Sequence, residues 1–115
     1  MPIETPVKLQ QVIREFEELR VSSNCSHTVT IDLMLTILEV GKGNGVTGRD
    51  VEELLGISQS KAMRTMDVLR KEKRNGGRGF DLIKEKKDPT NHRAIVRLPN
   101  ARLKAFMEKI NAHLE

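Results

Sequence analysis

The stretch TGRDVEELLGISQSKAMRTMDVL, residues 47–69, predicts two short helices joined by a three-residue turn. Thr47 can cap the first helix, and Asp50 lies three residues on, as in a capping box. Gly56 ends this helix, since glycine tolerates the left-handed backbone that a sharp turn requires. The stretch therefore has the layout of a helix-turn-helix, which we assign to residues 47–72.

The second helix of this pair, residues 59 to about 72, carries polar side chains on the face opposite its apolar residues. Ser58 can cap it and leave its amino end free to face a ligand. Such a helix fits the DNA major groove, where glutamine pairs with adenine, and lysine or arginine with guanine or phosphate. Helix-glycine-helix patterns also occur as plain packing motifs, so this stretch alone leaves DNA contact open. The candidate DNA-binding residues here are Ser58, Gln59, Ser60, Lys61, Arg64, Thr65 and Lys71.

A basic β-hairpin, residues 80–98, is predicted to follow. Apolar residues at positions 80, 82 and 83 mark the first strand, and the Asp-Pro-Thr-Asn stretch after it is typical of a turn. Alternation over residues 94–98 predicts a second strand, in which Ile95 and Arg97 share one face. A basic hairpin directly after a helix-turn-helix makes a winged helix. The candidate DNA-binding residues of this wing are Lys86, Lys87, Asn91, His92 and Arg93.

A basic, glycine-rich loop, KRNGGRG at residues 73–79, lies between the helix and the wing. Two interpretations of it stay open. It can be an arm that follows a phosphate strand or enters a minor groove, or it can be an ordinary solvated loop. If the loop binds DNA, Arg74 and Arg78 are the candidate residues.

The wing sequence resembles that of the MarR family of winged-helix transcription regulators. In that family an apolar pair is followed by a wing of the form Asp-Pro-x-Asp-x-Arg-Ala. This chain has Leu82-Ile83 and then Asp88-Pro89-Thr90-Asn91-His92-Arg93-Ala94, and the resemblance runs from about residue 30 to residue 103. It implies a homodimer that reads a palindromic DNA site, with the recognition helices in successive major grooves and Arg93 in or beside the minor groove. Residues 73–81 are an insertion relative to that family.

Apolar stripes predict a helix on either side of this core. Residues 9–19 and 103–114 each repeat apolar side chains at three- and four-residue intervals, and residues 30–40 predict a central, buried helix. The two outer stripes exceed what one winged-helix core can cover, so we expect a second copy to bury them in a two-fold dimer. The alternative is that both helices fold back onto their own core. The predicted dimer interface is Leu9, Val12, Ile13, Phe16, Leu19, Leu103, Phe106, Met107, Ile110 and Leu114.

Composition and charge agree with a nucleic-acid-binding domain. The chain has 115 residues, 37% of them hydrophobic and 31% charged, which suits one globular domain. Its net charge is +4, yet residues 61–93 contain 11 Lys and Arg against five Asp and Glu, so basic charge is concentrated in that segment. An aromatic content of 3% argues against stacking of single-stranded bases.

Several classes of protein are not expected. One cysteine, Cys25, allows no disulfide within the chain and no cysteine-built zinc site, and an inert thiol is favoured over a redox switch. The amino terminus lacks the profile of a signal peptide, and no apolar run is long enough for a membrane helix, so we expect a cytoplasmic protein without a membrane partner. We find no catalytic constellation, metal spacing or phosphate-cradling loop, and therefore expect no enzyme, metal or cofactor.

The sequence thus predicts a mainly α fold, a winged helix-turn-helix with a two-stranded wing and flanking helices in residues 1–22 and 100–115. The function that we expect is duplex-DNA binding by a homodimeric, MarR-like transcription regulator. Two alternatives stay open. One is a winged-helix adaptor that docks another protein, and the other is sequence-independent architectural binding of DNA or RNA.

Overall fold

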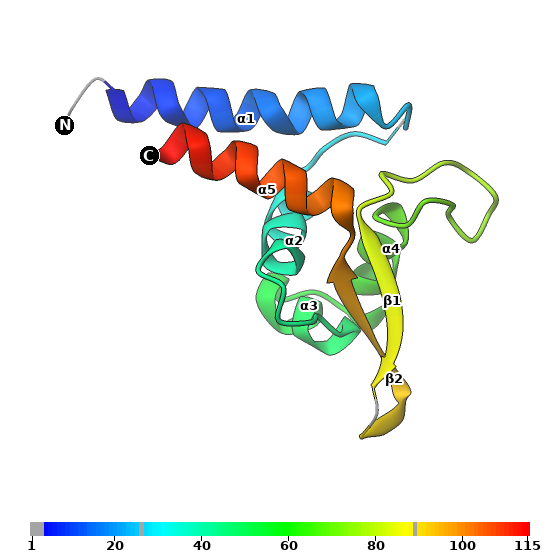
Figure 1. Ribbon diagram of the computed structural model, residues 1–115. Coiled ribbons are helices and arrows are strands. Elements are labelled where there is room, and N and C mark those ends of the chain that lie inside the picture. Colours follow the sequence, from blue (N-terminus) through cyan, green and yellow to red (C-terminus); the bar gives the residue numbers. More distant parts are fainter. Residues whose placement is uncertain (1–3, 26, 89) are drawn as a thin grey trace.

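The computed structural model describes residues 4–25, 27–88 and 90–115, and for residues 4, 5 and 91–94 it describes the backbone alone. Figure 1 shows helices α1 and α5 side by side along one side of the molecule, with the hairpin projecting away from them. The fold is the predicted winged helix-turn-helix with flanking helices. Its elements in chain order are α1 (Glu4–Ser22), α2 (Ile31–Gly41), α3 (Gly48–Leu55), α4 (Gln59–Val68), β1 (Ile83–Asp88), β2 (Asn91–Pro99) and α5 (Ala101–Leu114).

The turn chemistry predicted for the helix-turn-helix is confirmed. The Thr47 side chain accepts from the Asp50 N–H at 3.2 Å, and the Asp50 carboxylate accepts from the Thr47 N–H at 2.8 Å. Gly56 lies in the left-handed region with φ +64°, where the added Cβ of another residue would strain the backbone. The Ser58 hydroxyl accepts from the Lys61 N–H at 3.3 Å. These local interactions set the angle at which α4 leaves α3.

The core lies where α2, α4 and α5 meet the base of the hairpin. The side chains of Ile37, Leu69, Phe80, Leu82 and Leu103 are fully buried there. The α2 helix is central, as its sequence predicts, but the prediction that it is buried holds for one face only. Since its neighbours α4, α5 and β2 cover only one face, Ile31 and Leu35 remain 70% and 43% exposed.

The α4 helix ends at Val68, one turn before the predicted end near residue 72. The carbonyl oxygens of Val68 and Leu69 accept hydrogen bonds from the N–H groups of Phe80 and Leu82, at 2.8 and 2.9 Å. The returning chain therefore satisfies carbonyls that a helix end leaves unpaired. The prediction of a longer helix was wrong because this tertiary pairing replaces the last helical turn.

Gly79 makes that close approach possible. A Cβ added there would lie 1.8 Å from the carbonyl oxygen of Arg70 and 2.8 Å from that of Val68. Both obstacles are backbone atoms that cannot rotate away. Glycine is therefore required at the point where the loop of residues 73–79 rejoins the core.

The hairpin is antiparallel and starts at Ile83, whereas the sequence predicts a start at residue 80. Residues 80–82 are occupied by the contacts with the end of α4. Val46, just before α3, adds a bridge to the second strand. Its N–H donates to the Arg97 carbonyl at 2.9 Å, and its carbonyl accepts from the Arg97 N–H at 2.7 Å. This bridge attaches the base of the wing to the helix-turn-helix.

The outer helices run antiparallel and pack on each other. The rings of Phe16 and Phe106 meet edge to face, with centroids 5.0 Å apart. The Lys8 ammonium donates to the Glu115 carbonyl at 3.0 Å at one end, and Arg102 donates to the Ser22 hydroxyl at 3.1 Å at the other. Each helix thus covers part of the apolar stripe of the other within a single chain.

This packing divides the residues predicted to form a dimer interface into three groups. Phe16, Leu19, Leu103, Phe106 and Ile110 are buried within the chain, whereas Val12 and Met107 are half-buried. Leu9, Ile13 and Leu114 are 52%, 57% and 53% exposed. The exposed group is the part of the stripes that remains available to a second copy.

Candidate nucleic-acid interface

The outward face of α4 carries most of the residues predicted to read DNA. Gln59, Ser60, Lys61 and Arg64 are exposed, while Ala62 and Met66 on the opposite face are fully buried. Within the part of the chain that the structure describes, neither Lys61 nor Arg64 has an acidic side chain in ion-pair range. Both cations are therefore free to meet an anion from outside.

Two of the predicted residues are partly engaged by the helix itself. The Thr65 hydroxyl donates to the Lys61 carbonyl at 2.9 Å, and the Ser58 hydroxyl acts as the helix cap. Each oxygen keeps a lone pair for a second partner. A shallow pocket of about 280 Å³ lies beside them, lined by His27, Asp32, Ile57, Lys61, Arg64 and Thr65.

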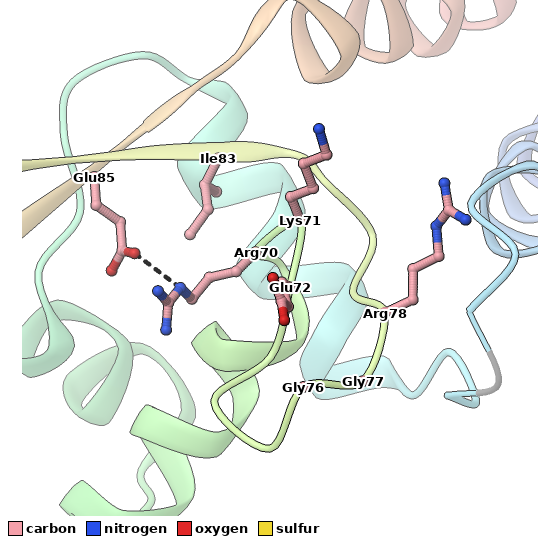
Figure 2. A pocket seen from close by; sticks show the side chains of 8 residues that line it. All are labelled: Arg70, Lys71, Glu72, Gly76, Gly77, Arg78, Ile83 and Glu85. Carbon is pink, nitrogen blue, oxygen red and sulfur yellow. Dashed lines mark ion pairs between the residues drawn. The ribbon is translucent and has the colours of Figure 1, made fainter.

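Lys71 and Arg78 lie on a different surface. With α4 ending at Val68, Lys71 belongs to the segment between α4 and β1, and together with Arg78 it lines a pocket of about 520 Å³ beside β1 (Figure 2). The Arg78 carbonyl accepts from the buried Cys25 thiol at 3.1 Å, which ties the loop to the connection between α1 and α2. The structure therefore does not bring these two cations together with those of α4.

On the wing, Lys86 and Lys87 are exposed, as a phosphate-contacting surface requires. The side chains of Asn91, His92 and Arg93 lie outside the described part of the molecule. Their assignment to the DNA interface stays a prediction.

A buried arginine that is not among the predicted site residues lies at the base of the wing. Arg97 is only 4% exposed, and its Nη1 donates to the Ile95 carbonyl at 2.9 Å. Its Nε lies 3.6 Å from Glu85 Oε2, an ion-pair distance that is too long for a hydrogen bond. Burial lowers the pKa of Arg97, and the charge of Glu85 partly opposes that shift.

Glu85 also binds the end of α4. Its Oε1 lies 3.0 Å from Arg70 Nε, the ion pair drawn in Figure 2, and Arg70 Nη1 lies 3.5 Å from Asp67. We call Asp67, Arg70, Glu85 and Arg97 the helix–wing ion cluster. Glu85 and Arg97 face each other across the hairpin, and opposite charges on facing strand positions attract. This pair of opposite charges is the feature of the sequence from which the cluster could have been predicted. The cluster connects the end of α4 to both strands of the wing.

In the described ranges, no three His, Cys, Asp or Glu side chains gather as metal ligands would. A helix both long and apolar enough to cross a bilayer is likewise missing from those ranges.

No family model and no curated protein matches the sequence. Solved structures match the fold closely enough to identify its type. The MepR–DNA complex from S. aureus has a TM-score of 0.66 at 11% identity, covering 96% of this chain and 81% of that one. The transcriptional regulator Tm0710 from Thermotoga maritima gives 0.64 at 16% identity, with coverage of 93% and 62%, so this chain spans less than two thirds of its length. MarR gives 0.58 at 14% identity, with coverage of 99% and 76%. The MarR-type winged-helix fold expected from the wing sequence is thereby confirmed.

Proposed function

We propose that this chain, which has the winged-helix fold of MarR and MepR, binds duplex DNA sequence-specifically as a homodimer and regulates transcription. The observation that carries the proposal is the outward face of α4. There Gln59, Lys61 and Arg64 are exposed on a helix whose opposite face is anchored in the core. An amide and two unpaired cations on one helix face are the groups that read base edges in a major groove. The MepR structure, solved with DNA, supports placing a duplex against this fold.

The dimer is part of the proposal. Apolar surface remains exposed toward the end of the molecule where the start of α1 lies beside the end of α5. Its residues are Leu9, Ile13 and Leu114. An α1-to-α1 contact about a two-fold axis would bury the same patch on both copies. The residues buried beneath it, Phe16 and Phe106 among them, would support the interface from within each protomer.

The test of this function is selection of bound sequences from a random duplex library. We expect a palindrome whose half-sites are about one helical turn, ~10 bp, apart. Binding without enrichment of any sequence would instead favour the architectural alternative. Absence of salt-sensitive duplex binding at ~50 mM salt would favour a protein adaptor and contradict the proposal.

Arg64→Ala is expected to relax the preference for one base pair in each half-site, at a loss of about 1–3 kcal/mol for the selected sequence. The loss follows if the guanidinium binds a guanine edge with two hydrogen bonds. The measurement is the affinity for the selected palindrome and for its single-base variants. Arg14→Ala, at an exposed arginine on α1, is the matched control. Equal losses on selected and random DNA would instead show that Arg64 contacts only phosphate.

A further inference from the structure

We propose that the groove between the end of α4 and the wing is a phosphate-binding site that holds the sugar–phosphate backbone of duplex DNA, with Arg74 of the inserted loop as a ligand. The inference rests on the proposed DNA-binding function and adds the location and residues of one backbone contact. We call this site the wing groove. It has a volume of about 350 Å³ and is lined by Arg70, Arg74, Glu85, Lys86, Lys87 and Ile95.

The charge of the wing groove favours an anion from outside. Four of its side chains are cationic and one is acidic. The acidic one, Glu85, is already shared between Arg70 at 3.0 Å and the buried Arg97 at 3.6 Å. Burial is the largest cause that lowers the pKa of Arg97, and the positive charges of Arg74 and Arg70 lower it further. Positive charge is therefore concentrated beside this groove. A concave surface with excess positive charge concentrates anions.

The position of Arg74 is fixed by its main chain. Its N–H donates to the Asp67 carboxylate, at 3.2 and 3.4 Å from the two oxygens. Asp67 lies on α4 and also pairs with Arg70, so one carboxylate orders two of the groove's cations. The loop is closed behind Arg74 by hydrogen bonds between residues 73 and 77, at 2.7 Å, and 76 and 73, at 2.9 Å. The loop therefore presents Arg74 from an ordered scaffold.

The second arginine of the same loop is directed elsewhere. Arg78 is not among the residues that line the wing groove, and Figure 2 shows its side chain pointing away from Arg70 and Glu85. Its carbonyl is held by Cys25 near the end of α1. Arg78 instead lines the neighbouring pocket at the base of β1, which shares Arg70 and Glu85 with the wing groove. The loop thus places only Arg74 in the groove itself, and Arg78 provides a control within five residues.

A DNA strand suits this location better than a small free anion. One backbone strand separates a major groove from the adjacent minor groove. A protein with α4 in the major groove and the wing at the minor groove must therefore pass that strand between helix and wing. The wing groove lies between those two elements and is lined by Arg70 and Arg74 from the chain after α4 and by Lys86 and Lys87 from β1. A phosphate there would meet cations from both sides.

The test compares Arg74→Ala, Arg74→Lys and Arg78→Ala with the unchanged protein on the same duplex between 50 and 200 mM salt. One phosphate contact adds about 0.9 to the slope of log K against log salt. We expect the slope to fall by about one for Arg74→Ala and to be unchanged for Arg78→Ala and Arg74→Lys. Thermal unfolding should be similar in all, because the bond to Asp67 uses the backbone of residue 74.

Three outcomes would overturn the proposal. An unchanged slope for Arg74→Ala removes the groove from the DNA interface. Equal losses for the two alanine variants show a diffuse cationic loop instead of a site. In a parallel experiment, the protein is titrated with inorganic phosphate. If phosphate binding saturates and is abolished by Arg74→Ala, while the slope for DNA is unchanged in that variant, the groove is assigned to a free anion. Failure of the unchanged protein to bind duplex DNA contradicts the proposed function itself. This outcome is distinguishable from failure of the wing-groove proposal, because it does not depend on residue 74.

Discussion

Glu85→Ala is expected to lower the free energy of unfolding by about 3 kcal/mol, because it leaves a buried guanidinium without its acidic partner. Arg97 is 4% exposed, so water cannot replace the carboxylate. The main-chain oxygen of Ile95 would still accept from Nη1, but the charge on Nε would have no counterpart within reach. Removal of one partner from a buried ion pair is more damaging than removal of both.

Urea unfolding checks this prediction, with the slope of free energy against urea confirming two-state behaviour. Glu53→Ala is the matched control, because Glu53 pairs with Arg49 at 3.7 Å on the surface, where side chains are 72% and 87% exposed. Its loss should not exceed about 0.5 kcal/mol. The double variant Glu85→Ala/Arg97→Met should recover most of the stability. A loss for Glu85→Ala as small as that for Glu53→Ala would show that Arg97 reaches solvent.

The same ion cluster connects stability to the proposed function. Asp67 and Arg70 belong to the recognition helix and its end, whereas Glu85 and Arg97 belong to the two strands of the wing. Two DNA-contacting elements can bind one duplex together only when the angle between them is held. A cluster that spans both, with Arg97 buried at its centre, is a means to hold it, and its two cations add to the positive field beside the wing groove.

The fold was predictable where local chemistry decides it. Caps at Thr47 and Ser58, and the left-handed turn at Gly56, depend on residues a few positions apart, and all three are present. The end of α4 was not predictable in this way. Residues 69–72 are good helix formers, but the carbonyls of Val68 and Leu69 accept from the N–H groups of residues 80 and 82, which lie twelve and thirteen positions further along the chain. Such pairing depends on Gly79, whose close approach has no local signal.

The residues of the candidate site also fall into two groups, those that the sequence predicts and those that it does not. Helical periodicity identifies Gln59, Lys61 and Arg64 as outward-facing, and the structure exposes them. Periodicity does not show that Arg97 is buried, since an arginine in an alternating strand normally faces solvent. Nor does it distinguish Arg74 from Arg78, because the surface that each arginine meets is set by tertiary contacts of the loop.

Ile13→Glu is expected to give a monomer and to lower the affinity for a full palindrome at least ~100-fold, because linked binding of two half-sites is lost. Ile13 is 57% exposed on α1, beside the buried Phe16, so a glutamate there fits the folded monomer but places two like charges across a two-fold contact. Sedimentation gives the oligomeric state, and fluorescence anisotropy gives the affinity for whole and half-sites.

Val21→Glu is the control for this change, since Val21 is an apolar residue on the same helix, 64% exposed and outside the predicted interface. It should remain dimeric and bind the palindrome as the unchanged protein does. Half-site affinity should be equal in both variants, because each recognition helix is intact. An Ile13→Glu dimer would place the interface elsewhere. A monomer with full palindrome affinity would show that the two half-sites are bound independently, and that dimerisation makes no contribution to recognition of the DNA.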